Sequence, residues 1–306
     1  MTEDEPITYN WIRGVEALEG YRHGGYHPVM VGDTVYNRYL IVDKLGSKGY
    51  STVWLALDNK LDGYVALKIQ GPNGTHTCYT VAPAQCNLRE ISYSRMFPLG
   101  VARALSYGVA LAVAYIHSEG YVHGDIHLNN VLARLPTKAY DLFVEDLYKA
   151  FGNPETVTVT RVDGKPLPSS VPSNAVRPLF LGKYAEKFLI SGARPLLSDF
   201  GEAFAPESET RLGRDSHTPA TDSPLSYPAN IWSLATAICE IMGMKVIFTN
   251  EYADEEEVQV AFLSMIRQML VYRPDERLGA KQVMESEWMV KWAYTDYERS
   301  LEDPAS

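Results

Sequence analysis

The segment YVHGDIHLNNVL, residues 121–132, constrains what this 306-residue chain can fold into more than any other. It sets His123, Asp125 and Asn130 at the spacing His-x-Asp followed by Asn five residues on. Before it, apolar residues recur every three to four positions over 101–120, which predicts a long, buried helix. The segment therefore predicts a loop of chemically active side chains held between that helix and an apolar pair.

A second polar motif, Asp199-Phe200-Gly201, lies further along the chain in LLSDFGEAF. Phosphoryl transfer needs a carboxylate to orient the acceptor hydroxyl, and oxygen ligands for the Mg²⁺ that bridges the phosphates. Asp125 can supply the first, and Asn130 and Asp199 can supply the second. Neither motif is specific alone, but their order indicates this chemistry. We therefore take Asp125 as a candidate catalytic residue and the other two as candidate metal ligands.

The region before these motifs has the pattern of an antiparallel sheet. Residues 38–70 contain three β-branched or aromatic runs, RYLIVDKLG, STVWLALD and GYVALKIQ. An Asn-Gly pair in residues 71–76 is a strong hairpin signal, so the third run is expected to turn directly into TCYTVA. Gly46 and Gly49 lie between the first two runs, where backbone amides can approach a phosphate. Lys68 lies in the third run.

These pieces have the order found in eukaryotic protein kinases, and closer features resemble the serine–arginine protein kinase (SRPK-like) family. The features are GGYHPV, LG followed by STVWLA, GPNGTH, HGDIHLNN, DFGEAF and SPLSYPANIWSLATAICEI. An insertion between the two polar motifs is similar to that family's spacer. The resemblance implies an α+β, two-lobed protein-kinase-like fold, with a small antiparallel β N-lobe and a mainly α-helical C-lobe. We expect an N-terminal extension over 1–37, the N-lobe over 38–84, and the C-lobe over 85–306 with the insertion at about 133–195.

The resemblance also implies a function. It is that of a serine/threonine protein kinase that transfers the γ-phosphate of ATP to serines of arginine/serine-rich proteins, with Mg²⁺ as cofactor. Asp125 would orient the serine hydroxyl, Lys68 would contact the α- and β-phosphates as a second catalytic residue, and Asn130 and Asp199 would bind Mg²⁺. The implied nucleotide-binding residues are Gly46, Gly49, Val53, Ala66 and Lys68.

The chain departs from the family at the helix called αC, whose glutamate pairs with the strand lysine. The stretch between Lys68 and His123 is too short for αC, two strands, a hinge and a further helix before the long one. We therefore expect αC to be missing. Glu90 is expected in a helix after the hinge, on a solvated face rather than as the partner of Lys68.

Three other positions also depart from the family pattern. The Ala-Pro-Glu anchor is missing before SPLSYP, which would leave Arg277, similar to the family's buried arginine, without its glutamate. Asn230 stands where the family has an aspartate that accepts hydrogen bonds from the catalytic loop. His127 replaces a lysine.

Two alternatives therefore stay open. One is a pseudokinase or truncated kinase acting as a nucleotide- or protein-binding module. The other is a small-molecule phosphotransferase of the aminoglycoside or choline kinase type, whose loops resemble HGDxHxxN.

Charge and composition bear on partners and location. The formal net charge of −10 suits a basic protein substrate and disfavours direct nucleic-acid binding. Three cysteines give no paired framework, which favours a reducing compartment. The start is acidic, and no apolar run approaches the roughly 18 residues of a membrane span. We expect an intracellular monomer in the cytoplasm and/or nucleus, with no membrane attachment.

Overall fold

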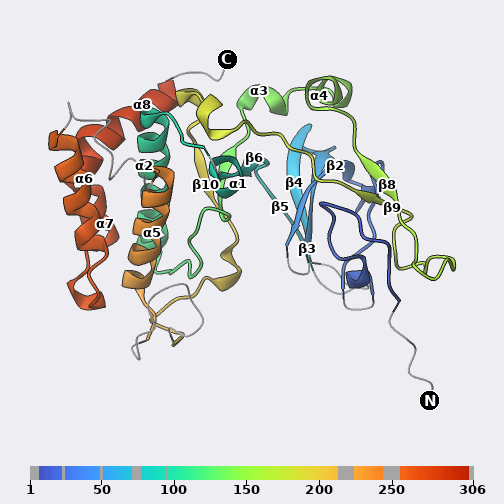
Figure 1. The fold of residues 1–306 in the computed structure, drawn as a ribbon, viewed down its shortest axis with the longest axis horizontal. Coiled ribbons are helices and arrows are strands. Elements are labelled where there is room, and N and C mark those ends of the chain that lie inside the picture. The colour runs from blue at the N-terminus through green and yellow to red at the C-terminus, as the bar shows by residue number, and fades with distance from the viewer. Residues whose placement is uncertain are drawn as a thin grey trace. The chain divides into compact units, whose positions relative to one another are not determined.

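The structure is a computed structural model that describes residues 7–22, 25–48, 51–70, 77–93, 95–212, 224–243 and 256–302. The chain divides into two compact units. The first comprises Met1–Pro83 and Leu135–Leu181, and the second comprises Ala84–Arg134 and Gly182–Ser306. In Figure 1 the large sheet belongs to the first unit and the long helices belong to the second.

A five-stranded antiparallel sheet forms the centre of the first unit, with the strand order β1-β2-β3-β4-β5. The strands are β1 (Thr34–Val35), β2 (Tyr39–Lys48), β3 (Ser51–Asp58), β4 (Gly63–Gln70) and β5 (Thr77–Val81). Strands β2, β3 and β4 are the three runs predicted from the sequence. Strand β4 pairs directly with β5, as expected, and the GPNGTH turn itself lies outside the described residues.

Different segments of the chain cover the two faces of this sheet. On one face Leu67 packs in a cluster with Val176, near the end of the insertion. On the other face Leu55 packs against Leu147, which lies in α4 (Val144–Phe151). The insertion therefore supplies apolar cover to both faces of the sheet.

The structure groups most of the insertion with the first unit, whereas the sequence led us to place it within the C-lobe. The reason is the apolar packing just described, together with a hydrogen bond from the backbone N–H of Leu179 to the oxygen of Lys44 at 2.7 Å. The N-terminal segment joins the same unit, because buried Glu16 forms an ion pair with Lys44. The other elements here are η1 (Leu18–Gly20), α3 (Thr137–Tyr140), β8 (Thr156–Thr158) and β9 (Asn174–Val176).

The second unit is mainly helical and contains a small sheet with the order β10-β7-β6. Its strands are β6 (Ala84–Asn87), β7 (Val131–Arg134) and β10 (Pro195–Leu197). Its α-helices are α1 (Leu88–Ser92), α2 (Leu99–Ser118), α5 (Tyr227–Ile241), α6 (Glu256–Met269), α7 (Ala280–Met284) and α8 (Tyr294–Glu302). Short 3₁₀ turns are η2 (Ala185–Lys187), η3 (Ile190–Gly192), η4 (Phe200–Glu202) and η7 (Pro274–Glu276), and η8 (Met289–Ala293) is a π-helix.

Helix α2 runs through the core of the second unit. It is 20 residues long with a mean hydropathy of 1.6, so by length and composition it could cross a membrane. Our expectation that no apolar run approaches this length was wrong. In the structure 56% of the 18-residue stretch with this mean hydropathy is buried. Leu105, Val109 and Val113 lie in the main hydrophobic cluster. Packing against neighbouring helices therefore accounts for its apolar composition.

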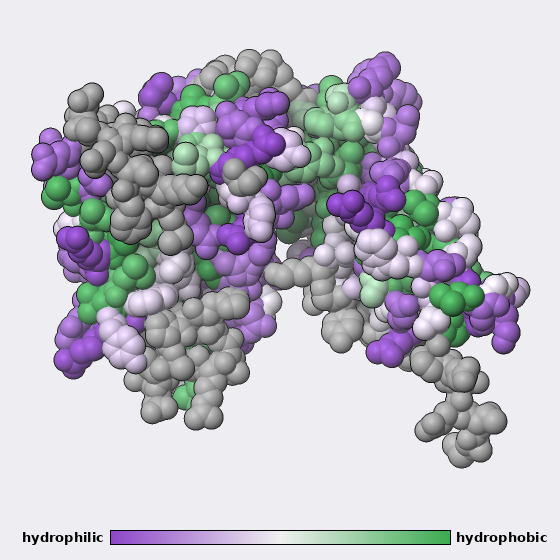
Figure 2. Space-filling view, in the orientation of Figure 1, coloured by the Kyte–Doolittle hydropathy of each residue, from purple (hydrophilic) through white to green (hydrophobic). Residues whose placement is uncertain are grey.

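Large exposed hydrophobic side chains occur in both units, for example Trp11, Tyr93 and Phe143. On the face drawn in Figure 2, hydrophobic and hydrophilic residues are interspersed. Scattered exposure of this kind is ordinary surface composition.

Candidate catalytic site

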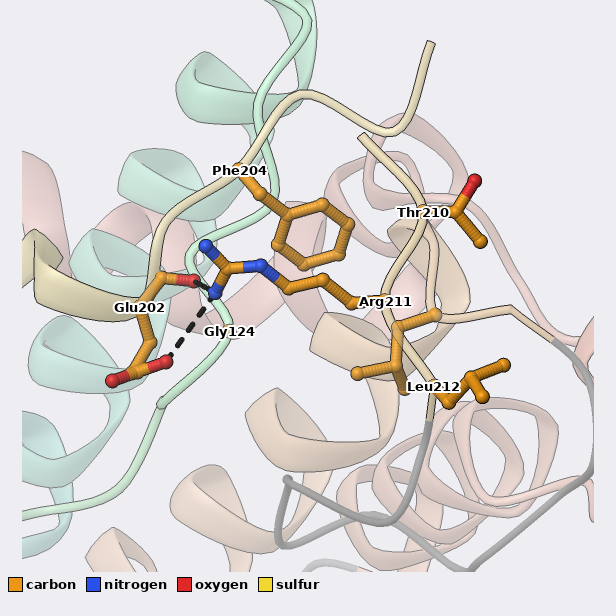
Figure 3. A pocket seen from close by; sticks show the side chains of 7 residues that line it. Gly124, Glu202, Phe204, Thr210, Arg211 and Leu212 are labelled. Atoms are coloured by element: carbon orange, nitrogen blue, oxygen red, sulfur yellow. Dashed lines mark hydrogen bonds and ion pairs between the residues drawn. The ribbon is translucent and has the colours of Figure 1, made fainter. Parts of the chain in front are cut away.

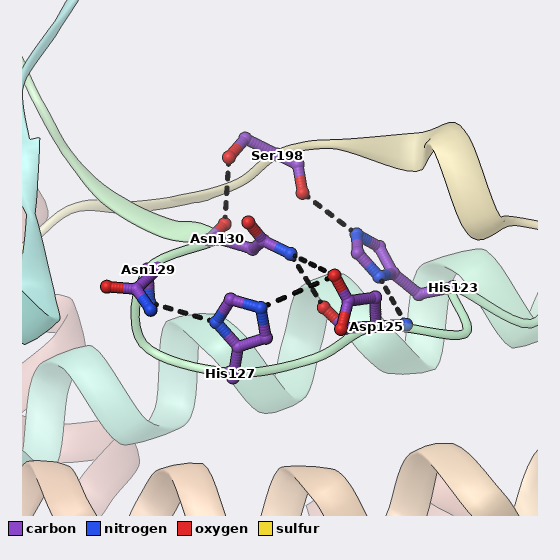
Figure 4. A network of polar contacts seen from close by, with 6 residues as sticks. All are labelled: His123, Asp125, His127, Asn129, Asn130 and Ser198. Atoms are coloured by element: carbon purple, nitrogen blue, oxygen red, sulfur yellow. Dashed lines mark hydrogen bonds and ion pairs between the residues drawn. The ribbon is translucent and has the colours of Figure 1, made fainter. Parts of the chain in front are cut away.

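Hydrogen bonds tie the loop between α2 and β7 to the strand that precedes Asp199 (Figure 4). His123 is 0% exposed, and its Nε2 lies 3.0 Å from the backbone oxygen of Ser198. Because a carbonyl oxygen only accepts, Nε2 carries the proton, while Nδ1 accepts from the backbone N–H of Asp125 at 3.3 Å. Burial lowers the pKa of the His123 imidazole, which agrees with a neutral ring. His123 therefore links the two polar motifs.

The structure brings Asp125 and Asn130 into direct contact. The side-chain nitrogen of Asn130 donates to Oδ2 and to the backbone oxygen of Asp125, both at 2.9 Å. Since the amide nitrogen faces Asp125, the amide oxygen is turned away from it (Figure 4). Asn130 is buried, whereas 23% of the Asp125 side chain is exposed. The pair can therefore present a carboxylate to a substrate hydroxyl and an amide oxygen to a cation.

The residue before Asp199 in the chain is hydrogen-bonded to Asn130. The N–H and the hydroxyl of Ser198 both donate to the backbone oxygen of Asn130 at 2.9 Å. Asp199 itself has φ 63° and ψ 67°, a left-handed conformation that is uncommon for residues other than glycine. The sequence pointed to Asp199 and Asn130, but it gave no signal for Ser198.

The donor set of Asn130 and Asp199 fits Mg²⁺. This ion prefers oxygen ligands and usually binds through one or two carboxylates together with substrate phosphates. An amide oxygen and a carboxylate are both oxygen ligands of this kind. Within the described ranges no group of three or more His, Cys, Asp or Glu side chains could hold a metal ion by itself.

His127 contacts the candidate catalytic carboxylate. Its Nε2 lies 3.3 Å from Oδ2 of Asp125, and its Nδ1 accepts from the backbone N–H of Asn129 at 3.2 Å. Nδ1 is therefore the acceptor, and Nε2 carries a proton directed at Asp125. The sequence showed only that a histidine replaces a lysine here, and the contact with Asp125 was not predicted.

Gly124 fixes the path of the loop. Its φ is +83°, and a Cβ added there would lie 2.4 Å from the backbone oxygen of Glu202, so a larger residue does not fit. Its N–H donates to Oδ1 of Asn230 at 3.2 Å. Asn230 is 2% exposed and lies on α5. The amide thus accepts a hydrogen bond from the loop, at the position where the resemblance places an aspartate.

The structure corrects the expectation for Arg277, which we thought would be left unpaired. Its guanidinium donates to three backbone oxygens, those of Val271 at 2.6 Å, Pro228 at 3.0 Å and Tyr272 at 2.9 Å. It also lies over the ring of Trp232, 4.9 Å from the centroid. Burial lowers its pKa. Backbone carbonyl groups and an aromatic ring therefore contact the Arg277 guanidinium, in place of the glutamate that the resemblance implies.

A pocket of about 410 Å³ lies beside the loop (Figure 3). Its lining residues come from the loop and from the segments around it: Gly124, Glu202, Phe204, Thr210, Arg211, Leu212 and Leu225. Arg211 donates to the backbone oxygen of Glu202 at 2.9 Å and to its carboxylate at 3.3 Å, and to the Glu209 carboxylate at 2.6 Å. Its guanidinium also lies 4.9 Å from the centroid of the Phe204 ring. Sequence reasoning did not single out this cluster.

The candidate nucleotide-binding residues lie in the sheet of the first unit. Val53 of β3 is opposite Lys68 of β4, and Ala66 lies two residues before the lysine. Because residues two apart on a strand share a face, Val53, Ala66 and Lys68 lie on the same face of the sheet. The Lys68 ammonium lies 5.7 Å from the centroid of the Tyr79 ring.

Gly46 and Gly49 are the two glycines of the expected phosphate loop. Gly46 is opposite Val53, and a Cβ added there would meet nothing within 4 Å, so its backbone is open to approach. Gly49 lies outside the described residues.

The structure also bears on the missing helix. Gln70 pairs with Thr77, so only residues 71–76 separate β4 from β5, and no helix stands between these strands among the residues whose placement is given. Glu90 lies in α1, after β6, and is exposed. Its backbone N–H donates to the side-chain oxygen of Asn87 at 2.8 Å, which is an N-cap. Glu90 therefore lies on a solvated helix turn, as expected.

Comparison with solved structures identifies the class of fold. A crystal structure of a kinase domain superposes with a TM-score of 0.51 at 14% identity, covering 94% of this chain and all of that chain. The fold is that of a protein kinase, and the expected fold class is confirmed.

Sequence comparison with curated proteins narrows the resemblance. The chain is 30% identical over 165 residues to the protein kinase dsk1 of Schizosaccharomyces pombe, covering 38% of this chain. It is 29% identical to the serine/threonine-protein kinase SRPK of Physarum polycephalum over 163 residues, or 38% of this chain, and 29% identical to SKY1 of Saccharomyces cerevisiae over 174 residues, or 40%. The matches span 30%, 38% and 24% of those three proteins. No protein-family model matches. The resemblance to kinases of the SRPK type is confirmed.

Proposed function

We propose that the chain is a serine/threonine protein kinase that transfers the γ-phosphate of ATP to serines of arginine/serine-rich proteins. The observation that carries the proposal is the direct contact between Asp125 and Asn130, in a loop hydrogen-bonded to the strand that leads into Asp199. This arrangement supplies, within one unit, a carboxylate for the acceptor hydroxyl and oxygen ligands for Mg²⁺.

In this proposal Asp125 accepts a hydrogen bond from the substrate hydroxyl and orients its oxygen toward the γ-phosphate. Asn130 and His127 hold the carboxylate in place through the contacts at 2.9 and 3.3 Å. As the bond between the substrate oxygen and the γ-phosphorus forms, the bond from that phosphorus to the β–γ bridging oxygen breaks and ADP leaves with the bridging oxygen. The hydroxyl proton passes to the Asp125 carboxylate. Asn130 and Asp199 would hold Mg²⁺, which neutralises charge on the phosphates when it is bound.

The first unit would bind the nucleotide. Lys68 supplies a positive charge for the α- and β-phosphates, and the backbone at Gly46 is open to a phosphate oxygen. Val53 and Ala66 lie on the same face of the sheet as Lys68. Their proposed contact with the adenine ring rests on the resemblance. The proposed role of Gly49 in the phosphate loop rests on the sequence alone.

The substrate class rests on charge and similarity. The net charge of −10 favours a basic partner. A human relative, 47% identical over 62 residues, is named SRSF protein kinase 3. We propose that this chain likewise acts on an arginine/serine-rich protein, as an intracellular monomer of the cytoplasm and/or nucleus that binds neither nucleic acid nor membranes directly.

Transfer of radiolabelled phosphate from Mg-ATP to a peptide of arginine–serine repeats tests the proposal. We expect incorporation on serine that requires Mg²⁺ and falls at least about 10²-fold in Asp125→Asn. Choline and an aminoglycoside serve as competing acceptors. Turnover of either small molecule without turnover of the peptide would replace this proposal with the phosphotransferase alternative.

One observation favours a second function, that of a nucleotide- or protein-binding module without catalysis. The direct pairing of β4 with β5 leaves no helix to supply a glutamate at that point, among the strands and helices described above. Binding to the native state raises stability by about 2.7 kcal/mol at a hundredfold excess of ligand over Kd. A melting temperature raised by Mg-ATP, with no transfer to any acceptor, would support the binding module.

A further inference from the structure

His117 and Asn230 form a polar contact behind the catalytic loop. His117 lies in the last turn of α2, and its Nε2 is 3.2 Å from the side-chain nitrogen of Asn230. On its other side Asn230 accepts the hydrogen bond from Gly124, also at 3.2 Å. The ring of Tyr227, in the first turn of α5, packs edge-on against the imidazole with centroids 4.9 Å apart. A buried amide thus bridges a histidine and the residue before Asp125.

Donors and acceptors in this chain of contacts can be assigned in one way only. The backbone N–H of Gly124 is a donor, so the oxygen of Asn230 must face it. The amide nitrogen then faces His117 and donates to Nε2, which must be unprotonated. The imidazole is therefore neutral, with its hydrogen on Nδ1. Burial lowers the pKa of His117 to about 4, which agrees with this assignment.

The orientation of the Asn230 amide matters because its two ends differ. If the amide turned over, its NH₂ group would face the N–H of Gly124, and two donors would meet in a buried place. The acceptor on His117 is what favours the orientation seen. Gly124 cannot readily move away from a turned amide, because its positive φ and its closeness to Glu202 restrict its backbone.

We propose that His117 is a positioning residue of the catalytic loop, acting through Asn230 while its imidazole is neutral. The histidine fixes the orientation of the amide, and the amide fixes the backbone next to Asp125. The neutral pair of His117 and Asn230 takes the place of the buried carboxylate that the resemblance implies at position 230. The effect on phosphoryl transfer rests on the proposed kinase function, whereas the hydrogen-bond assignment does not.

The first test compares two substitutions at one position. His117→Gln keeps an acceptor, because the side-chain oxygen of glutamine can receive the hydrogen of Asn230. His117→Leu removes it. We expect kcat for the arginine–serine peptide to fall about tenfold in the leucine variant, with KM values changed less than about twofold, and to stay within about threefold of wild type in the glutamine variant. Equal losses in both variants would overturn the proposal, since ring packing on Tyr227 would then be the whole role of His117.

The second test needs no activity. In Asn230→Asp the new carboxylate faces Nε2 of His117 and favours the charged ring, while it still accepts from Gly124. We expect the His117 pKa, read from its ring proton resonances by NMR, to rise by about two units or more relative to wild type. Among the described residues, the side chains in contact with the ring are those of Tyr227 and residue 230, both on α5, and the tyrosine is the same in both proteins.

The outcomes of the two tests separate the two proposals. A His117 pKa that differs by less than about half a unit between wild type and Asn230→Asp would overturn the positioning inference, because the ring would then not face residue 230. A clear rise in that pKa, together with no turnover of any peptide by wild type, would support the hydrogen-bond assignment and contradict the kinase proposal.

Discussion

The buried polar side chains of the first unit differ in charge from those around the catalytic loop. In the first unit several carboxylates and an ammonium group are buried: the side chains of Glu16 and Lys44 form an ion pair that is 2% and 1% exposed, and Asp43 is also 1% exposed. Around the loop the buried polar residues are neutral: His123, Asn130 and Asn230. The charged Asp125 there reaches solvent.

This difference decides what a substitution should do. Removing one member of a buried ion pair leaves an uncompensated charge in the interior, which costs several kcal/mol of stability. Removing a partly exposed charge costs little stability, because water replaces the lost contacts. We therefore expect changes in the first unit to appear in unfolding, and changes at the exposed edge of the loop to appear in activity.

The largest effect is expected for Asp125→Asn. The amide cannot accept the hydroxyl proton, so kcat should fall about 10²- to 10⁴-fold. The free energy of unfolding should change by less than about 0.5 kcal/mol, because the side chain is partly exposed. Steady-state kinetics and urea unfolding measure the two quantities, and Asp275→Asn, on the exposed turn η7, is the matched control. A loss of activity that follows a comparable loss of stability would contradict the distinction drawn here.

The next effect is expected for Glu16→Gln. The ammonium of Lys44 would lose its carboxylate while still buried beside the ring of Trp54, 5.5 Å from the centroid. We expect the free energy of unfolding to fall by about 3–5 kcal/mol in urea titrations.

Two further variants are controls for the Glu16 prediction. Asp146→Asn breaks the exposed pair with Lys149 and should cost less than about 1 kcal/mol. Adding Lys44→Met to Glu16→Gln removes the uncompensated charge, so the double variant should recover part of the loss. A single Glu16 variant no less stable than Asp146→Asn would show that the buried pair does not contribute.

A smaller effect is expected at Asp43, where the prediction concerns pH. Burial raises the pKa of this carboxyl from its ordinary value of 3.8 to about 6, and its Oδ2 has no hydrogen-bond partner within the described part of the chain. The folded chain therefore holds a proton that the unfolded chain releases. The contribution of this group to stability is present below about pH 4, is lost between about pH 4 and pH 6, and stays constant above that.

The loss across this window corresponds to roughly 1–3 kcal/mol. Asp43→Asn should lack it, so the difference in unfolding free energy between the variant and wild type should grow in favour of the variant from pH 4 to pH 6. Asp62→Asn, at an exposed position, is the control and should keep the wild-type pH dependence. Parallel curves for Asp43→Asn and wild type would contradict the raised pKa.

Local signals in the sequence explain which features could be predicted. The pairing of β4 with β5 was predicted from an Asn-Gly pair in the sequence, α2 from an apolar repeat, and the placement of Asp125 and Asn130 in one loop from a spacing of a few residues. In each case the partners lie close in the chain, so propensity and geometry act together.

The features that were missed have partners far apart in the chain. Nothing in the sequence connects Glu16 with Lys44. The insertion was predicted from the sequence, but nothing in it shows which face of which sheet lacks cover, and so the packing of Leu147 on Leu55 was not foreseen. His117 was hidden within the apolar repeat of α2, and only the position of Asn230 in space gives it a role.

The smallest effect is expected for the pair of Arg211 and Glu202, beside the pocket next to the loop. Their side chains are 28% and 66% exposed, so water screens the attraction. A double-mutant cycle with Arg211→Ala and Glu202→Gln should give a coupling energy of about 0.2–1 kcal/mol, and 1 M salt should largely remove it. The cycle with Glu16→Gln and Lys44→Met should give a larger coupling energy that salt changes little, because that pair is buried. Equal salt dependence in the two cycles would mean that exposure does not separate the two kinds of charge, and the comparison of the two regions would fail.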